Sequence, residues 1–240
     1  MKNNGAVVIP ARLKSSRFPG KPLAKINGKM MIHHVYDRCV KAVGKRLVYV
    51  ATDDSVISKA VKNFGGNVIM TSPDCLTGTD RLAEANMQLD YDFLVNVQGD
   101  EPMINPESIR TIFDAMMHNT SQVLNCYCLI KDKEISINTV PKVVVSESGR
   151  LIYMSRGGCP FDKNGTARAS FKQVCIYGFS RHHLEIFRNH PQKTINESLE
   201  DIEILRFLDL DYEVMMLKVA SGGMAVDTPE DLEQVRSLMS

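Results

Sequence analysis

Four basic side chains follow the first apolar segment of the chain. Ala6-Val7-Val8-Ile9 ends at Pro10, and the loop that follows carries small residues, Gly20 and the cations Arg12, Lys14, Arg17 and Lys21. Small residues let a backbone approach an anion and cations neutralise it, so this loop can hold a polyphosphate. The alternative is a solvated basic loop that binds nothing.

Two acidic positions elsewhere can hold a divalent cation beside such a phosphate. Gln98-Gly99-Asp100 directly follows the apolar segment 93–97, and a carboxylate at the end of a parallel strand can hold a cation against a bound phosphate. Asp227 precedes Thr228-Pro229, a pattern typical of the start of a helix. A surface turn also explains Asp100, and helix capping by Asp227 or Thr228 also explains the second position.

Two further loops offer groups for a ligand. Thr77-Gly78-Thr79-Asp80-Arg81 is typical of a helix N-terminus, and the same loop can supply N–H groups and Arg81 to a ligand. Arg156 ends a predicted strand before Gly157-Gly158 and can pair bidentately with a carboxylate. The alternative for Arg156 is an ordinary exposed arginine.

The motifs of several other enzyme classes do not occur in the sequence. It contains neither G-x-x-x-x-G-K-[ST] nor G-x-G-x-x-G, which argues against P-loop kinases, ATPases and dehydrogenases. The string around Ser180 lacks the second glycine of a nucleophile elbow, and the histidines form no recognisable relay. Cys126-Tyr127-Cys128 has no further ligands for zinc nearby, and its alternation along a strand predicts a place in the core.

Composition narrows the possible partners. The net charge of +1 creates no global field for nucleic acid or an anionic membrane, so any anion binding must come from a local cluster. No apolar run approaches the roughly 18 residues of a membrane span. Six cysteines without a disulfide pattern fit a reducing cytoplasm. The length allows one large domain or a body with a small annex.

The elements that must position these residues alternate through the first half of the chain. Strands are predicted at 7–10, 47–51, 68–71 and 93–98, and helices at 31–43, 55–64, 79–89 and 105–117. This alternation predicts a parallel sheet with helices on both faces. Ligands of such sheets bind beyond the carboxyl ends of the strands, where the loops 10–21, 71–81 and 98–102 should meet.

The second half predicts a mixed sheet with an antiparallel annex at about 150–180. Its predicted strands are 123–130, 142–146, 152–154, 173–179 and 214–219. Its predicted helices are 181–189, 199–210 and 228–239.

The motifs, in this order, resemble those of the 3-deoxy-manno-octulosonate (Kdo) cytidylyltransferases, and the resemblance covers nearly the whole chain. The strings that carry it are IPARLKSSRFPGKPL at 9–23, VATDD at 50–54, TGTDRLAE at 77–84, VNVQGDEPMI at 95–104, YMSRGGCPF at 153–161, IYGF at 176–179, LEDIEILRFL at 199–208 and VDTPEDLEQV at 226–235. One string alone would not be specific, but the first, fourth and last together are.

The resemblance implies an α/β, Rossmann-like nucleotide-diphospho-sugar transferase fold over residues 1–240. The annex at about 150–180 would serve sugar binding and dimerisation. The implied partners are CTP, Mg²⁺ and a 2-keto-3-deoxy sugar acid, Kdo or a close relative. The anomeric hydroxyl of the sugar acid attacks the α-phosphorus of CTP in line and yields the CMP-sugar and pyrophosphate. A cytoplasmic homodimer is expected.

The resemblance also implies roles for individual residues. The expected catalytic residues are Arg12, Lys21, Gln98 and Asp100. Arg12, Arg17 and Lys21 would grip the triphosphate, Gly78, Thr79 and Arg81 would lie near the cytidine, and Gln98 near the reacting centre. Asp100 and Asp227 would bind Mg²⁺. The expected sugar-binding residues are Arg156, Gln173, Tyr177 and Glu203.

Three departures from the family pattern fall on the sugar or dimer side. Gln173 begins Gln173-Val174-Cys175-Ile176-Tyr177 where the family usually has His-x-Gly-Ile-Tyr, Pro141 replaces a valine, and Gly157-Gly158-Cys159 replaces a more apolar run. The nucleotide side is intact. The alternatives are therefore a cytidylyltransferase for an acylneuraminate or an amino-Kdo and, from another class, a nucleotide-binding protein without turnover.

Overall fold

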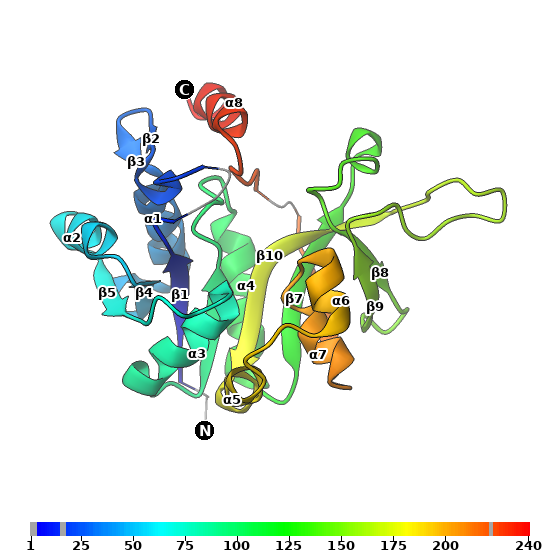
Figure 1. The fold of residues 1–240 in the computed structure, drawn as a ribbon, viewed down its shortest axis with the longest axis horizontal. Coiled ribbons are helices and arrows are strands. Elements are labelled where there is room, and N and C mark those ends of the chain that lie inside the picture. The colour runs from blue at the N-terminus through cyan, green and yellow to red at the C-terminus, as the bar shows by residue number, and fades with distance from the viewer. Residues whose placement is uncertain (1–3, 15–17, 221–222) are drawn as a thin grey trace.

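A computed structural model describes residues 4–14, 18–220 and 223–240, and its centre is a mostly parallel sheet (Figure 1). Strand β1 lies between β4 and β6 and is parallel to both, and β4 is parallel to β5. β10 is antiparallel to β6 and to β7, and β11 is parallel to β7. In spatial order the strands are β11 (Val214–Lys218), β7 (Val123–Leu129), β10 (Phe171–Ser180), β6 (Phe93–Val97), β1 (Gly5–Ala11), β4 (Val48–Thr52) and β5 (Asn67–Met70).

Helices cover both faces of this sheet, as the alternation predicts. Alternate residues of β1 point to opposite faces, so Val7 and Ile9 enter one core cluster and Ala6 and Val8 the other. The first cluster includes side chains of α1 (Met31–Val43), α2 (Ser55–Asn63) and α4 (Pro106–His118). The second includes side chains of α3 (Gly78–Leu89), α5 (Arg181–Asn189) and α7 (Leu205–Asp209). Cys126 and Cys128 are both buried in the first cluster, which confirms the core position predicted from their spacing.

A smaller antiparallel part leads away from the central sheet. β8 (Lys142–Val145) pairs with β9 (Leu151–Ser155) and, at Lys142, with Lys172 of β10. Figure 1 shows the segment between β9 and β10 projecting beyond the strands. The remaining elements are the short hairpin β2 (Lys25–Ile26) and β3 (Lys29–Met30), the helices α6 (Ile195–Glu200) and α8 (Pro229–Leu238), and the 3₁₀ turns Lys21–Leu23, Lys45–Leu47 and Asp132–Glu134.

The predicted helix 199–210 is wrong, because the structure has two short helices there, α6 and α7. Asp201 lies between them with a left-handed φ of 52°, which ends α6. The helix breaks here because Arg156, which lies outside the segment, bonds its backbone carbonyls. Its Nε donates to the carbonyl of Glu200 at 2.5 Å and its Nη2 to the carbonyl of Asp201 at 2.9 Å, so both carbonyls bond a side chain at the break.

No helix in the described part of the chain is long and apolar enough to cross a bilayer.

His183 makes the stability of this fold depend on pH. Its ring lies buried in the first turn of α5, with Nδ1 2.8 Å from Ser180 Oγ, and burial lowers its pKa from 6.5 to about 4. The unfolded chain therefore binds more protons than the folded chain between these values, and the free energy of unfolding falls as the pH drops from 6.5 towards 4. Over this pH range the free energy of unfolding of His183→Gln should fall by about 3 kcal/mol less than that of wild type.

The measurement is urea unfolding of both proteins at several pH values between 4 and 7. His182→Gln is the matched control, because His182 is the exposed neighbour on the same helix turn and its charge lowers the His183 pKa less than burial does, so most of the slope should remain. Equal slopes for wild type and His183→Gln would contradict a neutral buried imidazole.

Candidate active site

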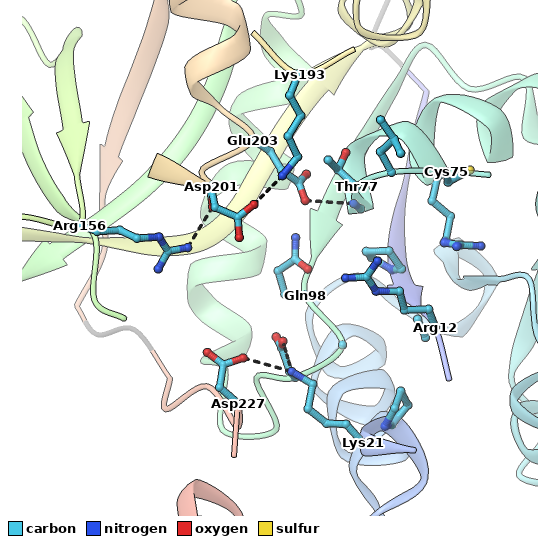
Figure 2. Close-up of a pocket in the computed structure, with 18 residues that line it drawn as sticks. Arg12, Lys21, Cys75, Thr77, Gln98, Arg156, Lys193, Asp201, Glu203 and Asp227 are labelled. Carbon is cyan, nitrogen blue, oxygen red and sulfur yellow. Dashed lines mark hydrogen bonds and ion pairs between the residues drawn. The ribbon is translucent and has the colours of Figure 1, made fainter. Parts of the chain in front are cut away.

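A pocket of about 520 Å³ opens at the carboxyl ends of β1 and β6 (Figure 2). The three loops predicted to meet there do so, since all three line it, and residues from the second half of the chain close the other side. The lining residues include Pro10, Arg12, Lys21, Cys75, Thr77, Gly78, Arg81, Gln98, Asp100, Arg156, Lys193, Asp201, Glu203 and Asp227.

Lys21 brings the two predicted metal-binding carboxylates together. Its Nζ lies 2.7 Å from Asp100 Oδ2 and 3.3 Å from Asp227 Oδ1. The backbone also joins the two segments, because Val226 N donates to the carbonyl of Asp100 at 2.9 Å. Positions that are far apart in sequence thus form one acidic group with a cation between its members (Figure 2).

Thr228, not Asp227, caps helix α8. The Thr228 side chain accepts from Asp231 N, and Asp231 accepts in return from the backbone of Thr228, which completes a capping box. The alternative explanation of Asp227 as the helix cap is therefore wrong. Its carboxylate points to Lys21 and the pocket instead.

The two carboxylates fit the requirements of Mg²⁺. Among the described residues no group of three or more His, Cys, Asp and Glu side chains could hold a metal ion by itself. Mg²⁺ differs from most metals in this respect, because it is commonly bound by one or two carboxylates together with substrate phosphates. The ammonium of Lys21 already lies between Asp100 and Asp227, so this point of the pocket favours positive charge.

The basic loop supplies exposed positive charge to the same pocket. Arg12 lines the pocket from the residue after β1, and Gly20 closes the loop by donating its N–H to the carbonyl of Leu13 at 3.0 Å. Gly20 has a φ of 73°, a conformation that favours glycine. Arg17 lies outside the described residues, so its predicted contact with the triphosphate stays a prediction.

The N-terminus of α3 is occupied by a carboxylate of the protein. Glu203 accepts hydrogen bonds from Gly78 N at 3.0 Å, from Thr79 N at 2.9 Å and from the Thr79 hydroxyl at 2.5 Å. Burial raises the pKa of Glu203, and these bonds act against that shift. The string 77–81 forms the N-terminus of α3, as predicted, and Thr77 caps the helix in a capping box with Asp80. Gly78 lines the pocket, whereas Thr79 is fully buried beneath it.

Arg81 contributes to the pocket from a buried position. Its Nη2 lies 3.1 Å from Asp53 Oδ1, and its Nη1 donates to the Thr71 hydroxyl at 2.5 Å. It therefore ties the first turn of α3 to the segments that follow β4 and β5. A residue held in this way shapes the wall of the pocket beside Gly78.

The four predicted sugar-binding residues separate into two pairs. Arg156 and Glu203 line the pocket. Gln173 and Tyr177 are both buried in the sheet, where Gln173 Nε2 donates to the Tyr177 hydroxyl and to Asn125 Oδ1, each at 3.1 Å. Burial also raises the pKa of the Tyr177 hydroxyl. In this structure Gln173 hydrogen-bonds Tyr177 inside the sheet, and neither residue is among those that line the pocket. A direct contact of either residue with a sugar stays a prediction.

Several pocket residues were not predicted from the sequence. Lys193 follows α5 and belongs to none of the strings that carry the resemblance. Asp201 lies in the string 199–208, but only Glu203 of that string was given a role. Cys75 also lines the pocket, but its thiol donates to Glu84 Oε2 at 3.3 Å, and burial raises its pKa to about 12. It is therefore no thiolate nucleophile.

Glu101, beside Asp100, is the other acid near the paired carboxylates. It is 6% exposed, and burial together with the charge of Asp100 raises its pKa to about 7. Its Oε2 has no hydrogen-bond partner among the described residues. Glu101 belongs to the same QGDE string as Gln98 and Asp100, but the resemblance implied no role for it.

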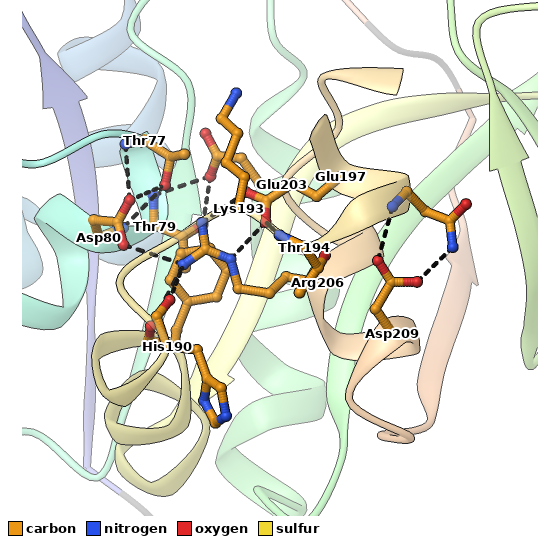
Figure 3. A network of polar contacts seen from close by, with 12 residues as sticks. Thr77, Thr79, Asp80, His190, Lys193, Thr194, Glu197, Glu203, Arg206 and Asp209 are labelled. Carbon is orange, nitrogen blue, oxygen red and sulfur yellow. Dashed lines mark hydrogen bonds and ion pairs between the residues drawn. The ribbon is translucent and has the colours of Figure 1, made fainter. Parts of the chain in front are cut away.

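A buried ion pair lies beside the part of the pocket wall that carries Lys193 and Glu203 (Figure 3). Arg206 donates through Nε and Nη2 to the two carboxylate oxygens of Glu197 at 2.6 and 2.7 Å, and both side chains are inaccessible to solvent. Arg206 also donates to the carbonyl of His190 at 2.9 Å and lies over the ring of Phe187, 3.6 Å from its centroid. The pair thus fastens α7 to α6 and to the end of α5.

A Rossmann-like sheet whose strand ends carry cations beside two paired carboxylates defines the protein as a nucleotidyltransferase. The family model described as cytidylyltransferase matches residues 6–222, and the chain belongs to this family.

Individual relatives narrow the comparison. The chain is 39% identical to the 3-deoxy-manno-octulosonate cytidylyltransferase of Escherichia coli, over 99% of this chain and 97% of the relative. It is 38% identical to the 8-amino-3,8-dideoxy-manno-octulosonate cytidylyltransferase of Shewanella oneidensis, over 96% of each. A solved structure of a CMP:2-keto-3-deoxy-manno-octonic acid synthetase complexed with CTP superposes with a TM-score of 0.91, at 39% identity and 98% coverage of both chains.

Proposed function

We propose that the protein activates a 2-keto-3-deoxy sugar acid, Kdo or its 8-amino relative, with CTP, releasing the CMP-sugar and pyrophosphate. The observation that carries this proposal is the meeting of Arg12, Lys21 and the Asp100–Asp227 pair in one pocket with Arg156 on its opposite wall. The names of the E. coli and Shewanella relatives support it.

The residues expected to bind the nucleotide neutralise negative charge and position the reacting groups. The anomeric hydroxyl forms a bond to the α-phosphorus while the bond to the β-phosphate oxygen breaks, and the negative charge collects on the leaving pyrophosphate. Arg12 and Lys21 neutralise that charge where it develops, which is the main contribution a protein makes to phosphoryl-type transfer. An anomeric hydroxyl is more acidic than an ordinary alcohol, so this chemistry requires no histidine relay.

Asp100 and Asp227 are the residues that would hold Mg²⁺, which supplies charge neutralisation at the α-phosphate and makes a nearby hydroxyl easier to deprotonate. Lys21 would then turn from the carboxylates to the phosphates. Gln98 lines the pocket beside Asp100, where its amide can orient the attacking group. Arg156 can pair with the carboxylate that every 2-keto sugar acid carries.

We also propose that the protein acts in the cytoplasm as a homodimer formed through the annex. Large apolar side chains are more than half exposed on β7, β9, the loop after β9, and α6, namely Leu129, Ile152, Phe161, Ile195 and Leu199. Exposed large apolar side chains that gather on one surface of a soluble protein commonly mark an interface. Sedimentation equilibrium should give twice the chain mass, and a monomer at micromolar concentration would contradict the proposal.

The function is tested by pyrophosphate release from CTP with a panel of acids: Kdo, the 8-amino acid and an acylneuraminate. Turnover of an eight-carbon acid is expected. If only the nine-carbon acylneuraminate were used, the substrate would be wrong. If calorimetry detected CTP binding but no acid were turned over, the protein would be a nucleotide-binding protein without this activity.

A further inference from the structure

Arg156 directly follows β9, and both polar groups of its backbone bond a charged side chain. Lys142 Nζ donates to its carbonyl at 2.6 Å, and its N–H donates to Glu200 Oε2 at 2.8 Å. The other carboxylate oxygen of Glu200 accepts from the Ser155 hydroxyl at 2.7 Å. A backbone bonded on both sides in this way has little freedom to rotate, so the direction in which the Arg156 side chain leaves the chain is fixed.

Lys142 is an unusual lysine, because it is fully buried in the structure. Its ammonium donates to three backbone carbonyls, at 2.8, 2.9 and 2.6 Å, namely those of Ile137, Val140 and Arg156. An ammonium has three N–H donors, so all of them are satisfied, as a buried charge requires. Ile137 and Val140 precede β8, and Lys142 therefore fastens this segment and the residue after β9 to one point.

The guanidinium of Arg156 is oriented as well as its backbone. It donates to three carbonyls: Nε to Glu200 at 2.5 Å, Nη2 to Asp201 at 2.9 Å and Nη1 to Asn138 at 3.4 Å. Of its five N–H groups, these bonds to described residues use three, and one on each Nη stays available to a ligand. The three partners are neutral, so the positive charge remains for an anion. Figure 2 shows Arg156 on the opposite side of the pocket from Arg12.

The orientation of Arg156 matters because pairing with a carboxylate is directional. Charge-assisted hydrogen bonds weaken steeply when the donors are misaligned, and a displacement of about 1 Å can cost a large part of the interaction. Lys142 and Glu200 lie outside the set of described residues that line the pocket, whereas Arg156 belongs to it. They can therefore act on a bound molecule through Arg156.

We propose that Lys142 and Glu200 are positioning residues that hold Arg156 in place for the carboxylate of the sugar acid. This inference rests on the proposed function, in which Arg156 pairs with that carboxylate. It gives the buried ammonium beside β8 a role in substrate binding. Loss of either residue should weaken the use of the sugar acid and leave the binding of CTP unchanged.

The test compares the sugar acid that wild type turns over best with its primary amide, which keeps the planar shape of the carboxylate but carries no charge. Pyrophosphate release at saturating CTP gives kcat/KM for both. Wild type should prefer the acid by about 10²-fold, and Lys142→Met should lower this preference to about tenfold. Glu200→Gln should act in the same direction, because the amide keeps one acceptor oxygen for two donors, Arg156 N–H and Ser155. In both variants the KM for the acid should rise about tenfold, and the KM for CTP should change by less than about twofold.

Two further variants calibrate the comparison. Arg156→Met should use acid and amide alike, which gives the lower limit of the preference. Lys59→Met, the same substitution at an exposed position of α2, is the matched control and should keep the wild-type preference. A variant with only a damaged fold would lose activity on acid and amide equally, so its preference would not change.

The outcomes separate this inference from the proposed function. A folded variant at Lys142 or Glu200 that retains the wild-type preference shows that this residue does not position Arg156. If urea unfolding shows that Lys142→Met does not fold, Glu200→Gln decides, because Glu200 is partly exposed and glutamine keeps its size. If wild type uses acid and amide alike, the inference is wrong while the proposed function stands. If wild type turns over no acid, the proposed function is wrong and the inference falls with it.

Discussion

Asp100→Asn should lower kcat at least about 10²-fold, because it removes one of the two charges that would hold the cation at the reacting phosphate. Asparagine keeps the size and the acceptor oxygen of Asp100 but cannot balance the Lys21 ammonium, which lies 2.7 Å from the carboxylate. Pyrophosphate release under single-turnover conditions measures the chemical step directly. Asp227→Asn should show a loss of the same kind, because its carboxylate contacts the same ammonium at 3.3 Å.

A matched control separates chemistry from folding. Asp114→Asn makes the same change on the exposed face of α4 and should leave kcat unaltered. Calorimetric titration with Mg²⁺ and CTP should show weaker binding of the metal complex by Asp100→Asn, a result that a fold defect alone would not give if the urea unfolding curves coincide. Near-normal turnover by Asp100→Asn would remove this residue from the mechanism.

Arg206→Met should lower the free energy of unfolding by about 3–5 kcal/mol, because it leaves the Glu197 carboxylate buried without its partner. The structure gives this pair two short bidentate hydrogen bonds and no access to solvent. The double variant Glu197→Gln/Arg206→Met should recover part of the loss, since it removes the uncompensated charge at position 197, while Asp80 still loses its contact with Arg206 at 3.4 Å. Urea unfolding measures all three proteins under the same conditions.

Arg188→Met is the control for the ion pair. Arg188 is an exposed arginine on the neighbouring helix α5, and its replacement should change the free energy of unfolding by less than about 0.5 kcal/mol. If Arg206→Met were as mild as this control, Glu197 would be neutralised by other means and the pair would not hold α6 to α7.

The local sequence was sufficient to predict the elements of the first half and the place of the site. The segment before Pro10 and the FLVNV strand have the apolar runs of buried parallel strands, and the predicted helices have apolar residues at helical spacing. Because the carboxyl ends of parallel strands share one edge, the meeting of Arg12, Lys21, Gln98 and Asp100 followed from the order of the elements.

The second half was less predictable because its decisive contacts are long-range. The 199–210 segment has a continuous helical pattern, yet Arg156, the residue after β9, bonds the carbonyls of Glu200 and Asp201 where the helix breaks. Gln173 matched a family position on the sugar side, but its side chain points to Asn125 and Tyr177 inside the sheet. No local pattern contains these partners.

The amino-acid sequence by itself determined the fold class, the family resemblance and the meeting of the loops 10–21, 71–81 and 98–102 at one pocket, since these depend on periodicity and on motifs that lie within single loops. Only the tertiary structure decided that Asp227 faces Lys21 while Thr228 caps the helix, that Glu203 occupies the start of α3, and that Lys193 and Asp201 form the far wall. The physical reason is that a charged side chain takes its role from its partner, and here each partner comes from a distant segment that only folding brings within a few ångströms.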